Sequence, residues 1–166
     1  LGSAESGMKI TMYWLNDLDP TSVTGEYLNE NYLKTLHHEF AHILHQTKNY
    51  PEEFQQLTKS DYLGDDWTNS DASEEVALQK GFISRYSRKN ANEDFVEILA
   101  YFITRSPDWW EEQLEQAGVN GKKTIEQKFD LVKDYLKNVW KIDIYELRSI
   151  VWRRSNSIGN LDLENL

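Results

Sequence analysis

Hydrophobic and polar positions along the chain divide it into one strand and a series of helices. Residues 9–15 alternate in polarity, with Ile10, Met12 and Trp14 on one face, which predicts a β-strand. The remaining apolar residues recur mainly at helical spacing, and no other stretch gives a comparable strand signal. We therefore expect a mainly α domain of the α+β class with a minimal β-sheet.

Caps and helix breakers locate the expected helices. A stretch at 93–104 is apolar nearly all round, which is typical of a buried helix. Capping-box patterns at 124–127 and 143–146 are predicted to open the last two helices. With the Pro and Gly positions they predict a helix from about 26 or 29 to 47, one at 52–58, and one capped by Ser73 or Asp71 that ends at 81. Further helices are predicted at 93–104, from Ser106-Pro107 to 117, from 124 and from 143.

The helix predicted at 26–47 separates apolar residues from imidazoles. At about 100° per residue, one face collects an apolar stripe that we expect to pack in the core. The residues of this stripe are Leu33, Leu36, Phe40 and Leu44. His38, His42 and His45 gather on the opposite side of the same helix. The imidazoles are therefore expected to lie together, away from the core.

The same helix carries the string His38-Glu39-Phe40-Ala41-His42. Two histidines four residues apart on a helix can both bind one Zn²⁺ at about 2.0–2.1 Å. The glutamate between them reaches water near the metal without binding the metal itself, as in H-E-x-x-H metallopeptidases. Such strings also occur by chance, but a plain surface helix does not account for three imidazoles on one face. We predict that His38 and His42 bind zinc and that Glu39 is the general base.

A catalytic zinc needs a third protein ligand. The longer H-E-x-x-H-x-x-G-x-x-H signature is excluded, because the chain has His45 and Lys48 at its last two defined positions. Glu93 and Glu97 share one face of the apolar helix, where two unpaired buried carboxylates would cost several kcal/mol each. A dication and a histidine N–H would offset that cost. We predict Glu93 as the third ligand and Glu97 as a hydrogen-bond partner of a ligand histidine.

Two alternatives stay open for these acids and for His45. Acidic residues are favoured in the first turn of a helix, which explains Glu93 without a metal but explains Glu97 less well. His45 shares the face of the two motif histidines, so it is a rival third ligand. We expect His45 instead to line the groove or to support a ligand.

Composition limits the classes of partner and of site. The 166 residues are 39% hydrophobic, enough for one domain with a core. A net charge of −10 without a Lys/Arg cluster argues against nucleic acid as a partner. The absence of Cys excludes thiolate ligands, so a metal must use histidine, carboxylate or water. No apolar run is long enough to predict a transmembrane segment.

The N-terminal residues 1–7 lack a starting Met and an apolar signal core. We expect them to be a cloning remnant or a linker. The catalytic domain is then expected at 8–166, as the C-terminal part of a longer protein.

Residues 37–104 resemble bacterial zinc metallopeptidases known as substrate import-associated zinc metallohydrolase lipoproteins. They are more distantly similar to the catalytic domain of anthrax lethal factor. The resemblance rests on the H-E-x-x-H string and on a second motif, Tyr-x-Arg-x-Asn-x-x-Glu-x-Phe-x-Glu. The stretch from Tyr86 to Glu97 matches that motif at each defined position.

The resemblance implies a zincin-like domain of the gluzincin type, with an active-site helix and a glutamate helix. It implies zinc on His38, His42 and Glu93, and a hydrogen bond from Tyr86 to the oxyanion. Without it, Tyr86 is equally well explained as one more packed aromatic residue. Zincins carry a small sheet beside the active-site helix, and only one strand is predicted here.

The resemblance also implies a function and a location. We expect a metallopeptidase that cleaves peptide or protein substrates in the cell envelope or outside the cell. The expected protein is a lipoprotein anchored outside this chain, with outer-membrane import proteins as partners. The main alternative is a non-catalytic zinc-containing binding component of a bacterial nutrient-import system. A hydrolase of other amide or acyl bonds and a toxin-like endopeptidase are further alternatives.

Overall fold

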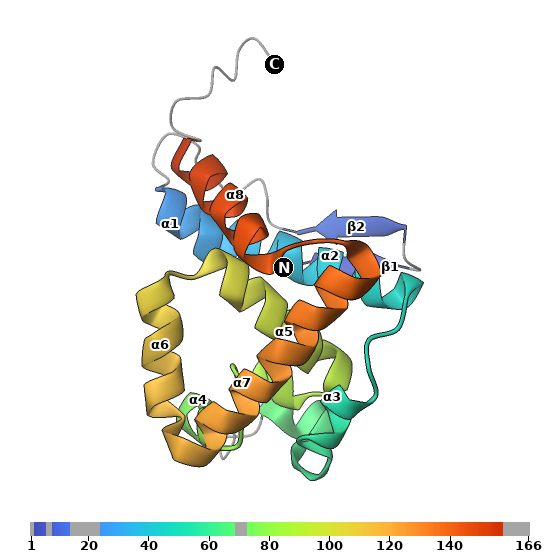
Figure 1. Cartoon of the computed structure of the whole chain (residues 1–166), viewed down its shortest axis with the longest axis vertical. Coiled ribbons are helices and arrows are strands. Elements are labelled where there is room, and N and C mark those ends of the chain that lie inside the picture. The colour runs from blue at the N-terminus through green and yellow to red at the C-terminus, as the bar shows by residue number, and fades with distance from the viewer. Residues whose placement is uncertain (1, 6–7, 14–23, 69–72, 158–166) are drawn as a thin grey trace.

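Helices make up most of the structure, and a two-stranded sheet lies at one edge (Figure 1). The computed structural model describes residues 2–5, 8–13, 24–68 and 73–157. Its strands are β1 (Gly2–Glu5) and β2 (Lys9–Met12). Its α-helices are α1 (Gly25–Leu28), α2 (Lys34–Thr47), α3 (Glu53–Gln56), α4 (Glu74–Gln79), α5 (Ala91–Thr104), α6 (Pro107–Gln116), α7 (Gly118–Tyr135) and α8 (Ile144–Ser157). Shorter 3-10 or π turns are η2 (Asn29–Leu33), η3 (Lys59–Asp61), η4 (Gly64–Thr68), η5 (Tyr86–Arg88) and η6 (Leu136–Trp140).

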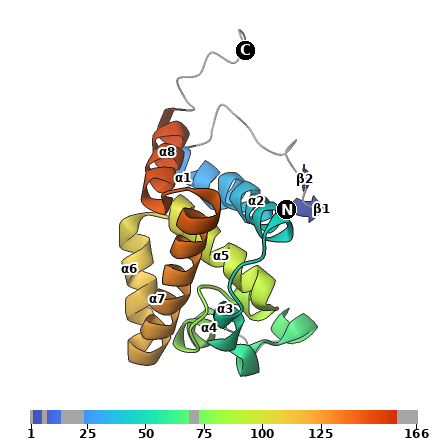
Figure 2. The same ribbon diagram turned by 45° about the vertical axis from the view of Figure 1, so that its right-hand side comes forward.

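The sheet is an antiparallel pair in which Gly2 lies opposite Met12 and Glu5 opposite Lys9. The predicted strand is confirmed over Lys9–Met12, while residues 14–15 lie outside the described residues. Four of the seven N-terminal residues expected to be a remnant or linker form β1. Figures 1 and 2 place the sheet beside α2, on the opposite side of the molecule from α6. The sheet therefore lies next to the helix that carries the H-E-x-x-H string.

Helix α5 is the centre of the core. Its apolar residues are buried nearly all round, as the sequence predicted, and they include Phe95, Val96, Ile98 and Leu99. Helices α2, α7 and α8 all pack against it. Among the described residues, every helix is too short or too polar to cross a bilayer. The mainly α architecture with a small sheet is thus confirmed.

Side-chain caps set several helix starts. Ser73, Ser106 and Asp143 each accept hydrogen bonds from backbone amides in the first turn of α4, α6 and α8, which confirms those predicted starts. The capping box predicted at Thr124 is wrong. Helix α7 already begins at Gly118, which takes a positive φ of 65° at the turn from α6. The Thr124 hydroxyl instead donates to a backbone carbonyl one turn earlier.

The predicted core stripe of α2 is also wrong for most of its length. Leu36 and Phe40 are 38% and 45% exposed, Leu33 is half-buried, and only Leu44 is buried in the core. The imidazole face of α2 is the face that meets α5, because α5 presents carboxylates there. Polar faces of two helices therefore pack together inside the molecule, and Leu36 and Phe40 of α2 point outward.

Candidate metal centre

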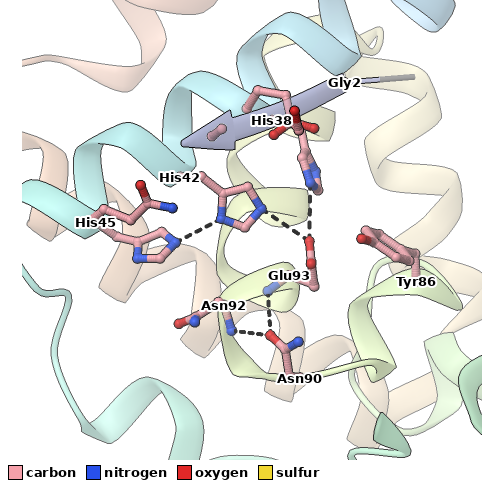
Figure 3. A pocket seen from close by; sticks show the side chains of 12 residues that line it. Gly2, His38, His42, His45, Tyr86, Asn90, Asn92 and Glu93 are labelled. Atoms are coloured by element: carbon pink, nitrogen blue, oxygen red, sulfur yellow. Dashed lines mark hydrogen bonds and ion pairs between the residues drawn. The ribbon is translucent and has the colours of Figure 1, made fainter. Parts of the chain in front are cut away.

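Three potential metal ligands from α2 and α5 converge in one pocket (Figure 3). The Nε2 atoms of His38 and His42 each lie 3.2 Å from Oε2 of Glu93. The three donor atoms lie within 4.8 Å of one another. In a tetrahedral zinc site with bonds of about 2.0–2.1 Å, neighbouring donors are about 3.3 Å apart. The spacing of this N₂O set therefore fits a zinc ion.

Local sequence explains why these side chains meet. His38 and His42 are one turn apart on α2, so their rings lie 4.9 Å apart on the same face. The side chain of Asn90 caps α5 by accepting hydrogen bonds from the backbone amides of Asn92 and Glu93. Glu93 therefore occupies the first turn of α5, directly facing the two imidazoles.

Glu97 lies one turn deeper and is only 1% exposed. Its Oε1 accepts hydrogen bonds from Nδ1 of His38 at 2.7 Å and from Nζ of Lys34 at 2.6 Å, and its Oε2 accepts from Oγ of Ser84 at 2.8 Å. Burial opposes its charge, yet Lys34 and His38 lower the pKa of Glu97 to about 2. Glu97 thus holds the His38 ring with Nε2 toward Glu93.

His45 supports the second imidazole. Its Nε2 lies 2.8 Å from Nδ1 of His42. Burial, helped by the nearby charge of His42, lowers the pKa of His45 to about 4. A neutral His45 accepts from Nδ1–H of His42, in the tautomer that leaves Nε2 of His42 facing Glu93. His45 therefore lies beside the three converging donors and is not one of them.

The charges of the cluster favour a cation between its members. Burial disfavours charge on His38, yet hydrogen bonds to Glu93 and Glu97 raise its pKa to about 9. Burial also opposes charge on Glu93, but the hydrogen bonds from His38 and His42 hold its pKa well below the usual range. Metal ligands must be deprotonated, so a bound dication would replace the proton held by His38. This charge balance is a second respect in which the residues fit zinc.

Glu39 and Tyr86 line the same pocket, which has a volume of about 390 Å³. Strand β1 passes directly over Glu39. A Cβ added at Gly2 would lie 2.7 Å from Cγ and 3.0 Å from Oε1 of Glu39, so only glycine fits there without a shift. The Tyr86 ring lies 5.8 Å from the His38 ring and packs edge-on against Trp67. Burial, followed by the charge of Glu93, raises the pKa of Tyr86, so its phenol stays a hydrogen-bond donor.

Six of the seven residues predicted for the site line this pocket, and the seventh, Glu97, lies behind His38 and is bonded to it. The sequence analysis missed Lys34, Ser84 and Lys89. The Nζ atom of Lys89 lies 3.6 Å from Oε1 of Glu93 and 3.5 Å from the Tyr86 hydroxyl. Lys34 lies one turn before His38 on the same helix, a spacing that would have signalled proximity to the motif. Ser84 has no such signal, because it precedes α5 in an irregular segment.

Comparison with known proteins bears directly on this cluster. A family model described as "Putative zinc-binding metallo-peptidase" matches residues 1–145. The chain belongs to this family. The predicted relationship to zinc metallopeptidases is therefore confirmed, and the family description names the metal that the donor set fits.

A solved member of the zinc-binding metallopeptidase family has the same fold. The crystal structure of a "putative zinc-binding metallo-peptidase" from Bacteroides caccae ATCC 43185 is 39% identical, with a TM-score of 0.84. The match covers 95% of this chain and 59% of that chain, so the present chain spans about three fifths of its structural neighbour. Among curated proteins, none matches the chain.

Proposed function

We propose that the chain is a zinc-dependent peptidase of the gluzincin type. In this proposal His38, His42 and Glu93 hold the metal, and Glu39 is the general base. The observation that carries it is the convergence of two imidazole nitrogens on one carboxylate oxygen at 3.2 Å, inside a pocket that Glu39 also lines.

The side chains of the pocket have separate tasks in peptide hydrolysis. When bound, zinc supplies a Lewis acid that polarises a carbonyl group and makes water acidic near pH 7. Glu39 takes the proton from the attacking water and passes it to the leaving amine. The Tyr86 hydroxyl donates a hydrogen bond to the negative charge that develops on the carbonyl oxygen. Glu97 and His45 keep the two imidazoles oriented throughout.

Strand β1 offers a way to hold a peptide. Gly2, Ser3 and Ala4 line the metal pocket, and β1 is paired with β2 along one edge. An extended peptide can add to the other edge of such a strand through main-chain hydrogen bonds. The close approach of Gly2 to Glu39 would bring the bound backbone within reach of the general base.

A non-catalytic zinc-binding component is the main alternative. The presence of Glu39 in the pocket favours hydrolysis, because a purely structural zinc site gains nothing from a base beside it. The expected anchoring in the cell envelope and the expected import partners stay predictions.

Metal analysis and peptide cleavage test the proposal. The purified chain should contain about one zinc per molecule and cleave peptides in a mixed pool, and a chelator should abolish cleavage. Glu39→Gln should keep its zinc and lose about 10²–10⁴-fold in turnover. The exposed Glu115→Gln should behave as wild type. Undiminished cleavage by Glu39→Gln would remove Glu39 from its role, and an inactive zinc-loaded chain would favour the binding component.

A further inference from the structure

A second hollow, of about 300 Å³, adjoins the metal pocket at the C-terminal end of α2. The two share His45, Gln46 and Asn92 as lining residues. Figure 3 shows His45 and Asn92 on the side of the metal pocket away from Tyr86. A peptide that extends from the metal centre toward His45 and Asn92 would pass this hollow with one of its side chains.

The lining of the hollow is mainly polar and carries one carboxylate, that of Glu52. Its other lining residues are Asn49, Tyr50, Glu52 and Gln55. The hollow has about ten times the roughly 30 Å³ that a water molecule occupies in the liquid, so a long side chain fits. An apolar side chain would leave these polar groups without hydrogen-bond partners. A positively charged side chain would gain hydrogen-bond acceptors and the charge of Glu52.

The nearest basic residue along the chain does not neutralise Glu52. The ammonium group of Lys48 lies 4.4 Å from the centre of the Trp140 ring and donates to the carbonyl of Val139 at 3.4 Å. Lys48 is thus held against η6, and it leaves the negative charge of Glu52 available to a ligand.

The wall that precedes Glu52 is fixed to α5. The Tyr50 hydroxyl donates to Oδ1 of Asn92 at 2.8 Å, and the Tyr50 ring stacks on Phe95 at 4.4 Å and 10°. Phe95 is fully buried in the core. Because Pro51 follows directly, the chain has little freedom between the anchored Tyr50 and Glu52. The hollow is therefore held at a constant position relative to the metal centre.

We propose that this hollow is a substrate subsite that selects a Lys or Arg side chain, with Glu52 as the residue that determines the preference. This inference rests on the proposed peptidase function, because it requires a peptide at the metal centre. Glu52 is exposed, so the charge preference should weaken as ionic strength rises.

Cleavage profiling tests the subsite. The zinc-loaded chain is incubated with a mixed peptide pool, and the residues flanking each cut are identified by mass spectrometry. At one flanking position, Lys and Arg should exceed Asp and Glu by about five- to tenfold, since pairing is exchanged for like-charge repulsion at a partly exposed site. Glu52→Lys should reverse that preference. The control Glu53→Lys changes the neighbouring exposed carboxylate, which lies outside the hollow, and should leave the cleavage preference unchanged.

A binding measurement separates failure of the subsite from failure of the peptidase. Zinc-loaded Glu39→Gln is titrated with fluorescein-labelled hexapeptide pools, each fixed as Lys or as Glu at one position. Tighter binding of one Lys pool that is lost in the Glu39→Gln/Glu52→Lys variant supports the subsite. If the wild type nevertheless cleaves no peptide, only the peptidase function is overturned. Cleavage with no basic preference, or a preference that Glu52→Lys leaves intact, overturns the subsite alone. If the chain shows no cleavage and no charge-dependent binding, both the subsite and the peptidase function are overturned.

Discussion

Replacing Glu97 with glutamine is expected to weaken zinc binding without changing any of the three metal-binding donors. The exchange keeps the size of the side chain and removes its charge. An amide oxygen can still accept from His38, but it no longer neutralises Lys34, whose ammonium lies 2.6 Å from Oε1 of Glu97. In the variant, Lys34 would place an unbalanced positive charge beside a site that must hold a dication.

The size of the effect follows from the burial of Glu97. Loss of a group that orients a metal-binding histidine typically costs about 10–100-fold in affinity, or about 1.4–2.8 kcal/mol. Glu97 is 1% exposed, so solvent screens its interactions little, and we expect a loss near the upper end of that range. Glu97→Ala should cost more, because it also removes the acceptor for His38 and Ser84.

Competition with a chromophoric chelator measures the zinc Kd, and the exposed Glu115→Gln serves as the matched control. A Glu97→Gln Kd within about twofold of wild type would refute the reasoning, because typical supporting groups contribute at least about tenfold.

The metal-free protein gives a second readout for the same variant. Hydrogen bonds to Glu93 and Glu97 raise the pKa of His38 to about 9 against the effect of burial. A raised histidine pKa stabilises the folded state fully below the ordinary value of about 6.5, and this stability is lost as pH rises through about 9. Urea unfolding of the chelated wild type should show that loss, and Glu97→Gln should show less of it. An equal pH dependence in both proteins would contradict the role of Glu97.

Two further predictions concern Tyr86 and the buried ion pair behind the site. Tyr86→Phe should keep the wild-type zinc Kd and lower kcat by about 10²–10³-fold in steady-state assays, and a change confined to KM would argue against oxyanion stabilisation. Lys128→Met leaves the buried carboxylate of Asp94 without its ion-pair partner, because Lys128 Nζ lies 2.7 Å from Oδ2 of Asp94 and both side chains are 0% exposed. Urea unfolding should show a loss of about 3–5 kcal/mol that Asp94→Leu partly restores, and a loss below about 1 kcal/mol would show that the pair is dispensable.

Local signals in the sequence were enough to place much of the fold. Alternation predicted β2, and the Ser106-Pro107 and Asp143 patterns predicted the starts of α6 and α8, because such caps act within a single turn. Strand β1 was missed because Gly2–Glu5 has no apolar alternation, and its pairing with β2 is a non-local contact. The early start of α7 was missed because the capping-box pattern at Thr124 predicts a later helix start. The turn between α6 and α7 is instead made at Gly118, which has a positive φ.

The candidate site was more predictable than the packing around it. Histidines one turn apart and a carboxylate pair at the same spacing carry their geometry in the sequence, and the structure brings those side chains together. The orientation of α2 was mispredicted because the apolar stripe was assumed to face the core. The face of α2 that carries Lys34 and His38 is bonded to α5, and Leu36 and Phe40 are left exposed, a pairing of helix faces that only the tertiary structure reveals.

The donor atoms of the centre come from α2 and α5, two helices that pack against each other in the core. Pulling these helices apart would separate the donors, so the unfolded chain would not retain the site. Zinc binding and folding are then linked equilibria. Free zinc at about 100 times its Kd adds about 2.7 kcal/mol to the free energy of unfolding. The melting temperature of the chain should therefore rise with the concentration of free zinc.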